Sequence, residues 1–421
     1  MTHANDLPAN PLSAAPAAGG RAAPRRLYMD NAATSFPKPR QVTEAMMRFA
    51  TDIGASAGRG AYAEAAEAGR VIAECRRLIN LLLHGESEQH VAFTLNATDA
   101  LNTAIHGLID PARGGHIICT ATDHNSVLRP CQALADAGVV SLSHVPVGSD
   151  GLLDPQDVRR AIRRDTRLVA MTHASNVTGA VQDARAVGRI CRELAVPFVL
   201  DAAQSVGHIP LNVQEDCVDV LCAPGHKSLL GPLGTGFMYL RPGMERRLRP
   251  LRQGGTGSQS DEPRHPDIMP DKYEAGSHNL VGLAGLLEGL RWVLAKGVDL
   301  LHEHQLALVR TFIGAVGQCP GLRYYGPQGV QNRLGVFSVA VDGLTPPEVS
   351  RRLEAEYGIL TRCGMHCAPL VHRAIGTFDA GGTARLSFGP FLQPQDVRFA
   401  ADALAEMAMA QATATTSTTA R

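Results

Sequence analysis

The sequence carries no excess of charge of either sign and few aromatic side chains. Its 421 residues contain 40 lysines and arginines against 40 aspartates and glutamates, so the formal net charge is zero. Binding to nucleic-acid phosphates requires clustered basic charge, and 5% aromatic residues with one tryptophan give bases no stacking surface. These shortages argue against a nucleic-acid-binding protein.

Long apolar runs are also missing, since none approaches the roughly 20 residues that a membrane-spanning helix needs. Residues 1–26 lack the apolar core of a secretory signal, and their composition is typical of a disordered tail. An organelle transit peptide is the alternative, but prolines would interrupt its amphipathic helix. Residues 406–421, rich in threonine and alanine, are predicted to form a second disordered tail. We expect no membrane partner.

The chain length and the cysteine content indicate the number of domains and the compartment of the protein. A chain of 421 residues exceeds what one core usually serves, so two domains are expected, over residues 27–262 and 263–405. A long helix from Asn279 to Lys296 is assigned to the second, smaller α/β domain. Nine cysteines, an odd number without regular spacing, indicate reduced thiols in a cytoplasmic enzyme.

Two short apolar runs in the first domain each lead to a charged residue. Residues 197–200 are followed by Asp201, and residues 218–223 by a turn that reaches Lys227. Such runs suit buried strands of a parallel sheet, and ligands of these sheets bind beyond the carboxyl ends of the strands. The simpler interpretation is a turn-forming aspartate and a solvated lysine. A phosphate-binding P-loop is excluded because His226 replaces the glycine required before its lysine.

A carboxylate and an amine at one sheet edge are the parts of a pyridoxal phosphate site. A lysine amine condenses with the aldehyde of this cofactor, and a carboxylate keeps its pyridine nitrogen protonated, so the ring withdraws electrons from a substrate carbanion. Lys227 would be the first group and Asp201 the second.

Several motifs around these residues carry a family resemblance. The stretches LDAAQSVGHIPLN, VDVLCAPGHKSLLGPLGTGFMYL, YEAGSHN and RCGMHCA resemble, in order, those of the class V aminotransferases, specifically the cysteine desulfurase and selenocysteine lyase family. The resemblance runs from Leu27 to about Ala400. It implies an α/β protein of pyridoxal-phosphate fold type I, with a mostly parallel central sheet and a smaller C-terminal domain on which the first residues also pack. It further implies a homodimer.

The resemblance also implies roles for residues that hold the cofactor. Thr98 follows a strand at a helix start, where an anion is favoured, and would otherwise be a helix cap. His124 would stack on the ring, and Asn176 and Gln204 would reach its phenolic oxygen, whereas the simpler interpretation of all three is loop polarity. Ser277 would bind the phosphate of the other subunit or merely cap a helix. The cofactor-binding set is therefore Thr98, His124, Asn176, Asp201, Gln204, His226, Lys227 and Ser277.

One residue departs from the family pattern at the phosphate. Pro224 stands where the family usually carries serine or threonine, two residues before the histidine of the Gly-His-Lys motif. One phosphate contact is therefore expected to be lost, while the chemistry of the ring is unaffected.

The resemblance also implies a set of residues that bind the substrate. Arg385 would bind the α-carboxylate, because a planar guanidinium fits two oxygens at once; otherwise it would be an exposed ion-pair partner. Arg59 would reach the neighbouring subunit's site, although a glycine-flanked arginine is more often simply exposed. The predicted substrate-binding residues are Asn31, Ala32, Arg59, Arg362 and Arg385.

Cys367 resembles the family cysteine that takes sulfur from the substrate as a persulfide. A thiol in a polar loop near arginines is the kind whose pKa falls. The rivals are an inert buried thiol and a metal site formed with Cys363 and His366, for which no fourth ligand cluster is present. We therefore expect no metal.

The sequence thus predicts an enzyme that removes sulfur from L-cysteine and leaves L-alanine. Lys227, Cys367 and His124 are its predicted catalytic residues. L-Selenocysteine is the alternative substrate, racemisation or transamination the alternative reaction, and a degenerate binding partner in iron–sulfur cluster assembly the non-enzymatic alternative. A sulfur-acceptor protein is a further expected partner.

Overall fold

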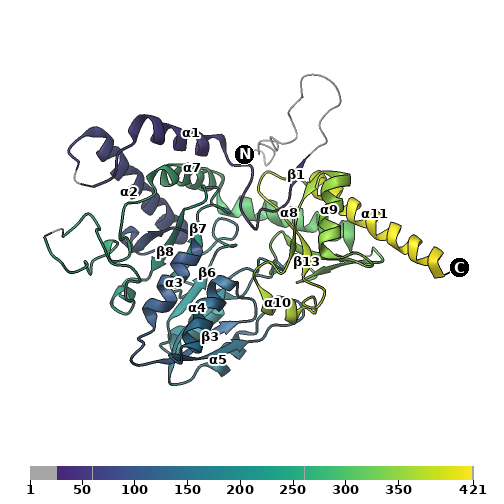
Figure 1. Ribbon diagram of the computed structural model, residues 1–421, viewed down its shortest axis with the longest axis horizontal. Helices are drawn as coiled ribbons and strands as arrows, with labels where there is room; N and C mark the ends of the chain where they lie inside the picture. Colours follow the sequence, from purple (N-terminus) through teal and green to yellow (C-terminus); the bar gives the residue numbers. More distant parts are fainter. Residues whose placement is uncertain (1–25, 59, 260, 318, 420–421) are drawn as a thin grey trace.

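The computed structural model describes residues 26–58, 60–259, 261–317 and 319–419. The predicted tail over residues 1–25 and the predicted site residue Arg59 lie outside these ranges. The chain forms two units, each built on a sheet with helices packed against it, and the C-terminal helix extends away from the smaller unit (Figure 1). The predicted α/β class with a mostly parallel central sheet is confirmed.

The larger sheet has seven strands, and only one of them runs against its neighbours. Their order is β2 (Val91–Thr94), β8 (Gly236–Leu240), β7 (Val220–Pro224), β6 (Phe198–Asp201), β5 (Thr166–Thr172), β3 (Gly115–Thr120) and β4 (Val140–Val145). The strand β8 pairs antiparallel with both β2 and β7, and the remaining pairs are parallel. The strands β6 and β7 are buried along their whole length, as their unbroken apolar runs predict.

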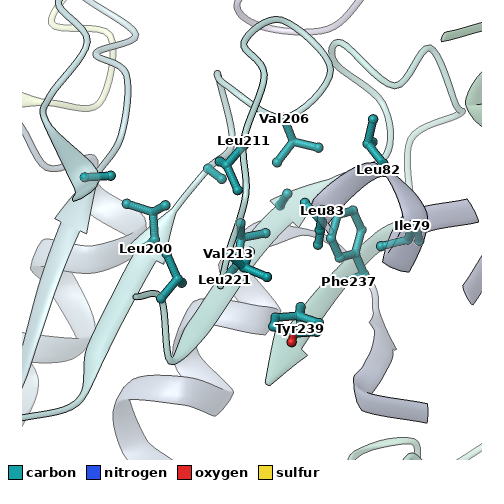
Figure 2. Close-up of a cluster of buried hydrophobic side chains, with 14 of the residues drawn as sticks. Ile79, Leu82, Leu83, Leu200, Val206, Leu211, Val213, Leu221, Phe237 and Tyr239 are labelled. Atoms are coloured by element: carbon teal, nitrogen blue, oxygen red, sulfur yellow. The ribbon is translucent and has the colours of Figure 1, made fainter. Parts of the chain in front are cut away.

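Helices bury both faces of this sheet. One face carries Leu200, Leu221 and Phe237, which pack with Ile79 and Leu83 of a long helix (Figure 2). The helices of this unit are α1 (Arg40–Arg48), α2 (Ala63–Leu83), α3 (Ala97–Leu108), α4 (Asn125–Asp136), α5 (Pro155–Ala161), α6 (Ala184–Glu193) and α7 (Leu280–Lys296). Shorter turns are η2 (Phe49–Ile53), η3 (Glu88–His90), η4 (Met244–Arg246) and η5 (Asp271–Tyr273).

The smaller unit is organised on an antiparallel sheet in the order β12 (Arg362–Gly364), β13 (Thr383–Ser387), β10 (Val336–Val341) and β9 (Leu322–Tyr325). Its core gathers Phe312, Phe337 and Phe388. Its helices are α8 (Val298–Val316), α9 (Pro346–Tyr357), α10 (Pro369–Ala374) and α11 (Pro394–Thr419). The first strand, β1 (Leu27–Tyr28), pairs with β11 (Ile359–Leu360), which ties the start of the chain to this unit.

Two predictions about the domains need correction. The helix α7 packs against α1 and α2 and contributes to the core of the larger unit, so it does not belong to the smaller one. We therefore propose that the boundary lies near Gly297, between α7 and α8. The expected tail over residues 406–421 is also wrong, because α11 runs to Thr419 and buries Met407 and Ala408 in the smaller core.

None of the helices in the described ranges is both long and apolar enough to cross a membrane.

Candidate active site

A cavity of about 310 Å³ opens at the carboxyl ends of β5, β6 and β7 and at the amino ends of α3 and α4. Parallel strands end at the same edge of a sheet, so the residues that follow them meet there. The cavity is lined by seven of the predicted residues, Thr98, His124, Asn176, Asp201, Gln204, His226 and Lys227.

Lys227 and Asp201 lie at the ends of neighbouring strands, since Asp201 stands opposite Cys222 in the β6–β7 pairing. Burial lowers the pKa of the Lys227 amine to about 8, while the negative charge of Asp201 raises it. Burial raises the pKa of Asp201, against a hydrogen bond from Ala203 N at 2.9 Å and the charge of Lys227. A neutral amine, which is the nucleophilic form, is therefore accessible near physiological pH.

The turn that presents Lys227 is fixed by the carbonyl oxygen of His226. This oxygen accepts hydrogen bonds from Ser35 N at 3.0 Å, Ser35 Oγ at 3.0 Å, Thr34 Oγ1 at 3.1 Å and Lys38 Nζ at 3.3 Å. The His226 ring is bound as well, with Nδ1 3.1 Å from Thr34 Oγ1. The segment after β1 thus holds the backbone next to Lys227.

The amino end of α3 forms one end of the cavity. Asn96 caps this helix by accepting a hydrogen bond from Asp99 N at 2.9 Å, and Ala97 and Thr98 line the cavity. Gly236 of β8 packs directly on the cap, where an added Cβ would stand 2.6 Å from Asn96 Cα. The hydroxyls of Thr98 and Ser126 lie 2.8 Å apart. A helix terminus with two hydroxyls is suited to an anion such as a phosphate.

His124 caps α4 and faces the same cavity. Its Nδ1 accepts a hydrogen bond from Ser126 N at 3.1 Å and lies 2.9 Å from Ser126 Oγ. Burial and, to a smaller extent, the charge of Lys227 lower the pKa of His124 to about 4. The imidazole is therefore neutral at physiological pH, which allows it to lie flat against a cationic ring without charge repulsion.

Asn176, which lines the cavity, is bound by Arg385 of the smaller unit. Arg385 Nη1 donates to Asn176 O at 3.0 Å, and Nη2 donates to Asp30 Oδ1 at 2.6 Å. Burial lowers the pKa of Arg385, although the carboxylate of Asp30 opposes this. Asn31 is buried and donates from Nδ2 to Ser387 O at 3.3 Å.

Gln204 turns toward the start of the chain and donates from Nε2 to Ala32 O at 2.9 Å. The Ala32 N–H is bound in turn by Ser387 Oγ at 2.9 Å. The segment after β1 is thereby joined to both units.

Cys367 lies in a strained turn after β12. His366 and Cys367 have φ angles of 48° and 58°, which L-residues adopt only when their surroundings impose them. Two carbonyls hold this turn: His366 O accepts from Asn176 Nδ2 and Cys367 O from Asn125 N, both at 2.7 Å. Exposed Cys367 is thus anchored beside Asn176, which lines the cavity, and beside Asn125, which follows the cavity-lining His124.

The other predicted residues in the described ranges do not line the cavity in this chain; they are Asn31, Ala32, Ser277, Arg362, Cys367 and Arg385. Ser277 is exposed in the segment before α7. Arg362 is exposed on β12, but its charge still lowers the pKa of Lys227 and that of His124. Arg59 lies outside the described residues.

The residues around the cavity fit pyridoxal phosphate. A volume of about 310 Å³ suits a small ring ligand, and Asn176 Oδ1 is buried without a hydrogen-bond partner. The amino end of α3 with Thr98 and Ser126 would hold the phosphate, Asp201 the pyridine nitrogen and Lys227 the aldehyde carbon. In the part of the chain that the structure describes, no cluster of three or more ligating side chains could hold a metal ion.

Sequence reasoning missed several residues of this site. Ser126 lines the cavity and binds both Thr98 and His124, and its only signal is its place in the first turn of α4, directly after the loop that follows β3. Lys38 and Asp30 act on His226 and Arg385, which lie 188 and 355 positions away. Contacts over such separations leave no local pattern.

Comparisons with known proteins agree with this geometry. The aminotransferase class-V family model matches residues 27–399. A "probable cysteine desulfurase" from Methanothermobacter thermautotrophicus is 31% identical over 385 residues, which cover 91% of this chain and 94% of the relative. A "cysteine desulfurase" from Dickeya dadantii is 31% identical over 353 residues, or 82% of this chain and 84% of the relative.

A solved structure is similar over the same range. The apo cysteine desulfurase of Thermococcus onnurineus has a TM-score of 0.84 at 29% identity, covering 91% of this chain and 95% of that chain. The family model spans nearly all of the described residues, and relatives above 30% identity cover most of the chain. The chain therefore belongs to the cysteine desulfurase branch of the class-V aminotransferase family.

Proposed function

We propose that this chain is a pyridoxal-phosphate-dependent cysteine desulfurase that converts L-cysteine to L-alanine and holds the removed sulfur as a persulfide. The observation that carries the proposal is the anchoring of the Cys367 turn to the cavity of Lys227. Asn176 binds the carbonyl before the thiol residue, and the backbone N–H next to His124 binds the carbonyl of Cys367 itself. A cysteine and an amine are thereby directed to one site.

Each residue has a definable task. When bound, the cofactor supplies an electron-withdrawing ring that stabilises negative charge at the substrate α-carbon. Lys227 takes the α-proton and returns it, helped by the burial that lowers the pKa of its amine to about 8. Arg385 binds the α-carboxylate, and neutral His124 covers one face of the ring.

The sulfur step belongs to Cys367. Its thiolate forms an S–S bond to the substrate sulfur while the C–S bond breaks, and the electron pair of that bond stays on the carbon, which is protonated to give alanine. The sum is L-cysteine plus a protein thiol, giving L-alanine plus a protein persulfide. A sulfur-acceptor protein, for example in iron–sulfur cluster assembly, would then take the outer sulfur.

The direct experiment is incubation of the purified, cofactor-loaded protein with L-cysteine, L-selenocysteine and L-alanine. Alanine and sulfide formed from L-cysteine in the presence of a thiol reductant would support the proposal. Turnover of selenocysteine alone would favour a selenocysteine lyase, and racemisation of L-alanine without sulfide would move the assignment to another class-V reaction.

We further propose a cytoplasmic homodimer. All nine cysteines are free thiols, which suits a reducing compartment. A hollow between α1, α2 and α7 is lined by Arg48, Arg70, Arg77, Arg291, Glu67, Glu74, Glu88 and Glu288 over an apolar floor. The four arginines already pair with glutamates of the same face, so no large net charge opposes its contact with a second copy of itself. Exposed Ser277 would then reach the partner's phosphate, and an active monomer in sedimentation analysis would remove Ser277 from the site.

A further inference from the structure

Three buried polar atoms in the described residues lack a hydrogen-bond partner and belong to side chains that are joined to one another. They are Asn176 Oδ1, Arg385 Nε and His366 Nε2. Asn176 links the other two, because its Nδ2 donates to His366 O and its carbonyl accepts from Arg385 Nη1. His366 is 5% exposed and Arg385 2%. Buried polar atoms are seldom left unpaired, so this joined group, of which Asn176 lines the cavity, indicates a ligand.

His366 is held by a second histidine. His366 Nδ1 lies 3.4 Å from His372 Nε2, and the two rings stack with their centroids 5.5 Å apart. His372 Nδ1 lies 2.7 Å from Thr377 Oγ1, and both residues are buried. The backbone closes the same loop, since Thr377 N donates to His372 O at 2.8 Å. The position of the His366 ring is therefore set by a chain that ends at Thr377.

This chain can present a hydrogen at its free end. Burial lowers the pKa of His366 to about 2 and that of His372 to about 4, so each neutral ring carries one N–H at physiological pH. If the Thr377 hydroxyl donates to His372 Nδ1, then His372 Nε2 donates to His366 Nδ1. His366 Nε2 then bears the hydrogen and has no other acceptor.

Arg385 shows why such a donor is needed. Its Nη1 is bound to Asn176 O and its Nη2 to Asp30, so part of the guanidinium fork is already occupied. The Nε–H remains without a partner. A carboxylate has two oxygens, so a donor from another side chain can bind the second oxygen beside this N–H.

We propose that His366 Nε2, oriented by His372 and Thr377, binds the α-carboxylate of the amino-acid substrate together with Arg385 Nε. This inference rests on the proposed function. It makes His366 a residue that selects for the carboxylate, and it makes His372 and Thr377 positioning residues.

The test is a binding titration of the cofactor-loaded protein, followed by its visible spectrum. L-Alanine has the carboxylate and no sulfur, and ethylamine lacks the carboxylate. His366→Leu should raise the Kd for L-alanine about tenfold or more, since a hydrogen bond to a charged group is lost, and leave the Kd for ethylamine unchanged. His366→Gln, which keeps an N–H donor, should restore most of the affinity.

Thr377→Val should weaken L-alanine binding in the same direction and leave ethylamine binding unchanged. Its matched control is Thr166→Val, which removes the hydroxyl 3.0 Å from Nδ1 of buried His116, away from the cavity. This control should alter neither Kd.

An equal loss of L-alanine and ethylamine binding in His366→Leu would show a structural role and overturn the inference. If His366→Leu does not fold, an unchanged ratio of the two Kd values in Thr377→Val would overturn it. Failure of the wild type to form alanine from L-cysteine would reject the proposed function alone, because the L-alanine titration does not depend on sulfur chemistry.

Discussion

Replacing Lys227 by methionine should change how the stability of the cofactor-free protein depends on pH. Burial lowers the pKa of the Lys227 amine from 10.5 to about 8 in the folded protein. The unfolded chain recovers the ordinary pKa, so between these two values the unfolded state binds more protons than the folded state. The free energy of unfolding of the wild type therefore rises with pH across this window, and the contribution is absent in Lys227→Met.

The size of the effect follows from the shift. One pKa unit corresponds to about 1.4 kcal/mol, so the wild type should gain up to about 3 kcal/mol relative to Lys227→Met between pH 8 and 10.5. Lys38, whose pKa is also lowered to about 8 by burial, is present in both proteins and cancels in the comparison. Below pH 8 the difference between the two proteins should be constant.

Urea unfolding of both cofactor-free proteins at pH 7.5, 9 and 10.5 measures this difference. Methionine has a similar length and no charge, so the packing of the site is preserved. A difference in unfolding free energy that stays flat from pH 8 to 10.5 would mean that the Lys227 amine has an ordinary pKa. The argument that burial prepares a neutral nucleophile would then be wrong.

Three further outcomes are expected. Lys227→Ala should lose the visible absorption of the cofactor-loaded protein, and a wild type that stays colourless with excess pyridoxal phosphate would contradict the whole cofactor site. Cys367→Ala should keep that spectrum but lose alanine formation by at least about 10³-fold, whereas Cys363→Ala should stay active; mass spectrometry that finds the added sulfur only on Cys363 would refute the assignment. Glu274→Gln should lower the unfolding free energy by about 3–5 kcal/mol, because it leaves Arg76 buried without a charged partner, and Glu193→Gln in the exposed Arg159 pair should change it by less than about 1 kcal/mol.

The strand ends were the predictable part of the site. Asp201, Lys227 and Asn176 each follow an apolar run, and parallel pairing of β5, β6 and β7 brings all three to one cavity. Local sequence suffices for this result, because it needs only the existence of each strand and the rule that ligands bind beyond the carboxyl ends. The bonding roles of these residues toward the cofactor stay predictions.

Tertiary contacts determine three features that the local sequence pattern does not show: the helix α11, the unit that α7 joins and the contact of Asp30 with Arg385. The segment around Met407 has the alanine and threonine content of a tail, but alanine also favours helix, and burial of Met407 and Ala408 against the smaller core stabilises α11. The helix α7 is apolar around much of its surface, so its pattern did not show which unit it joins. Asp30 reaches Arg385 because its segment pairs with Ser387, on the strand that carries Arg385.

The register of the smaller sheet decides which cysteine serves the site. Arg362 stands opposite Arg385 in the β12–β13 pairing, and Cys363 stands opposite Ala384. Residues directly opposite share a face, so Arg362 lies on the face from which Arg385 reaches Asn176, and Cys363 lies on the face of Ala384, whose side chain belongs to the smaller core. A shift of one residue would exchange these faces. Cys367 escapes the alternation because it lies beyond β12, in a turn whose carbonyls are bound by Asn176 and Asn125, and this placement is the reason why we propose Cys367 as the reactive thiol.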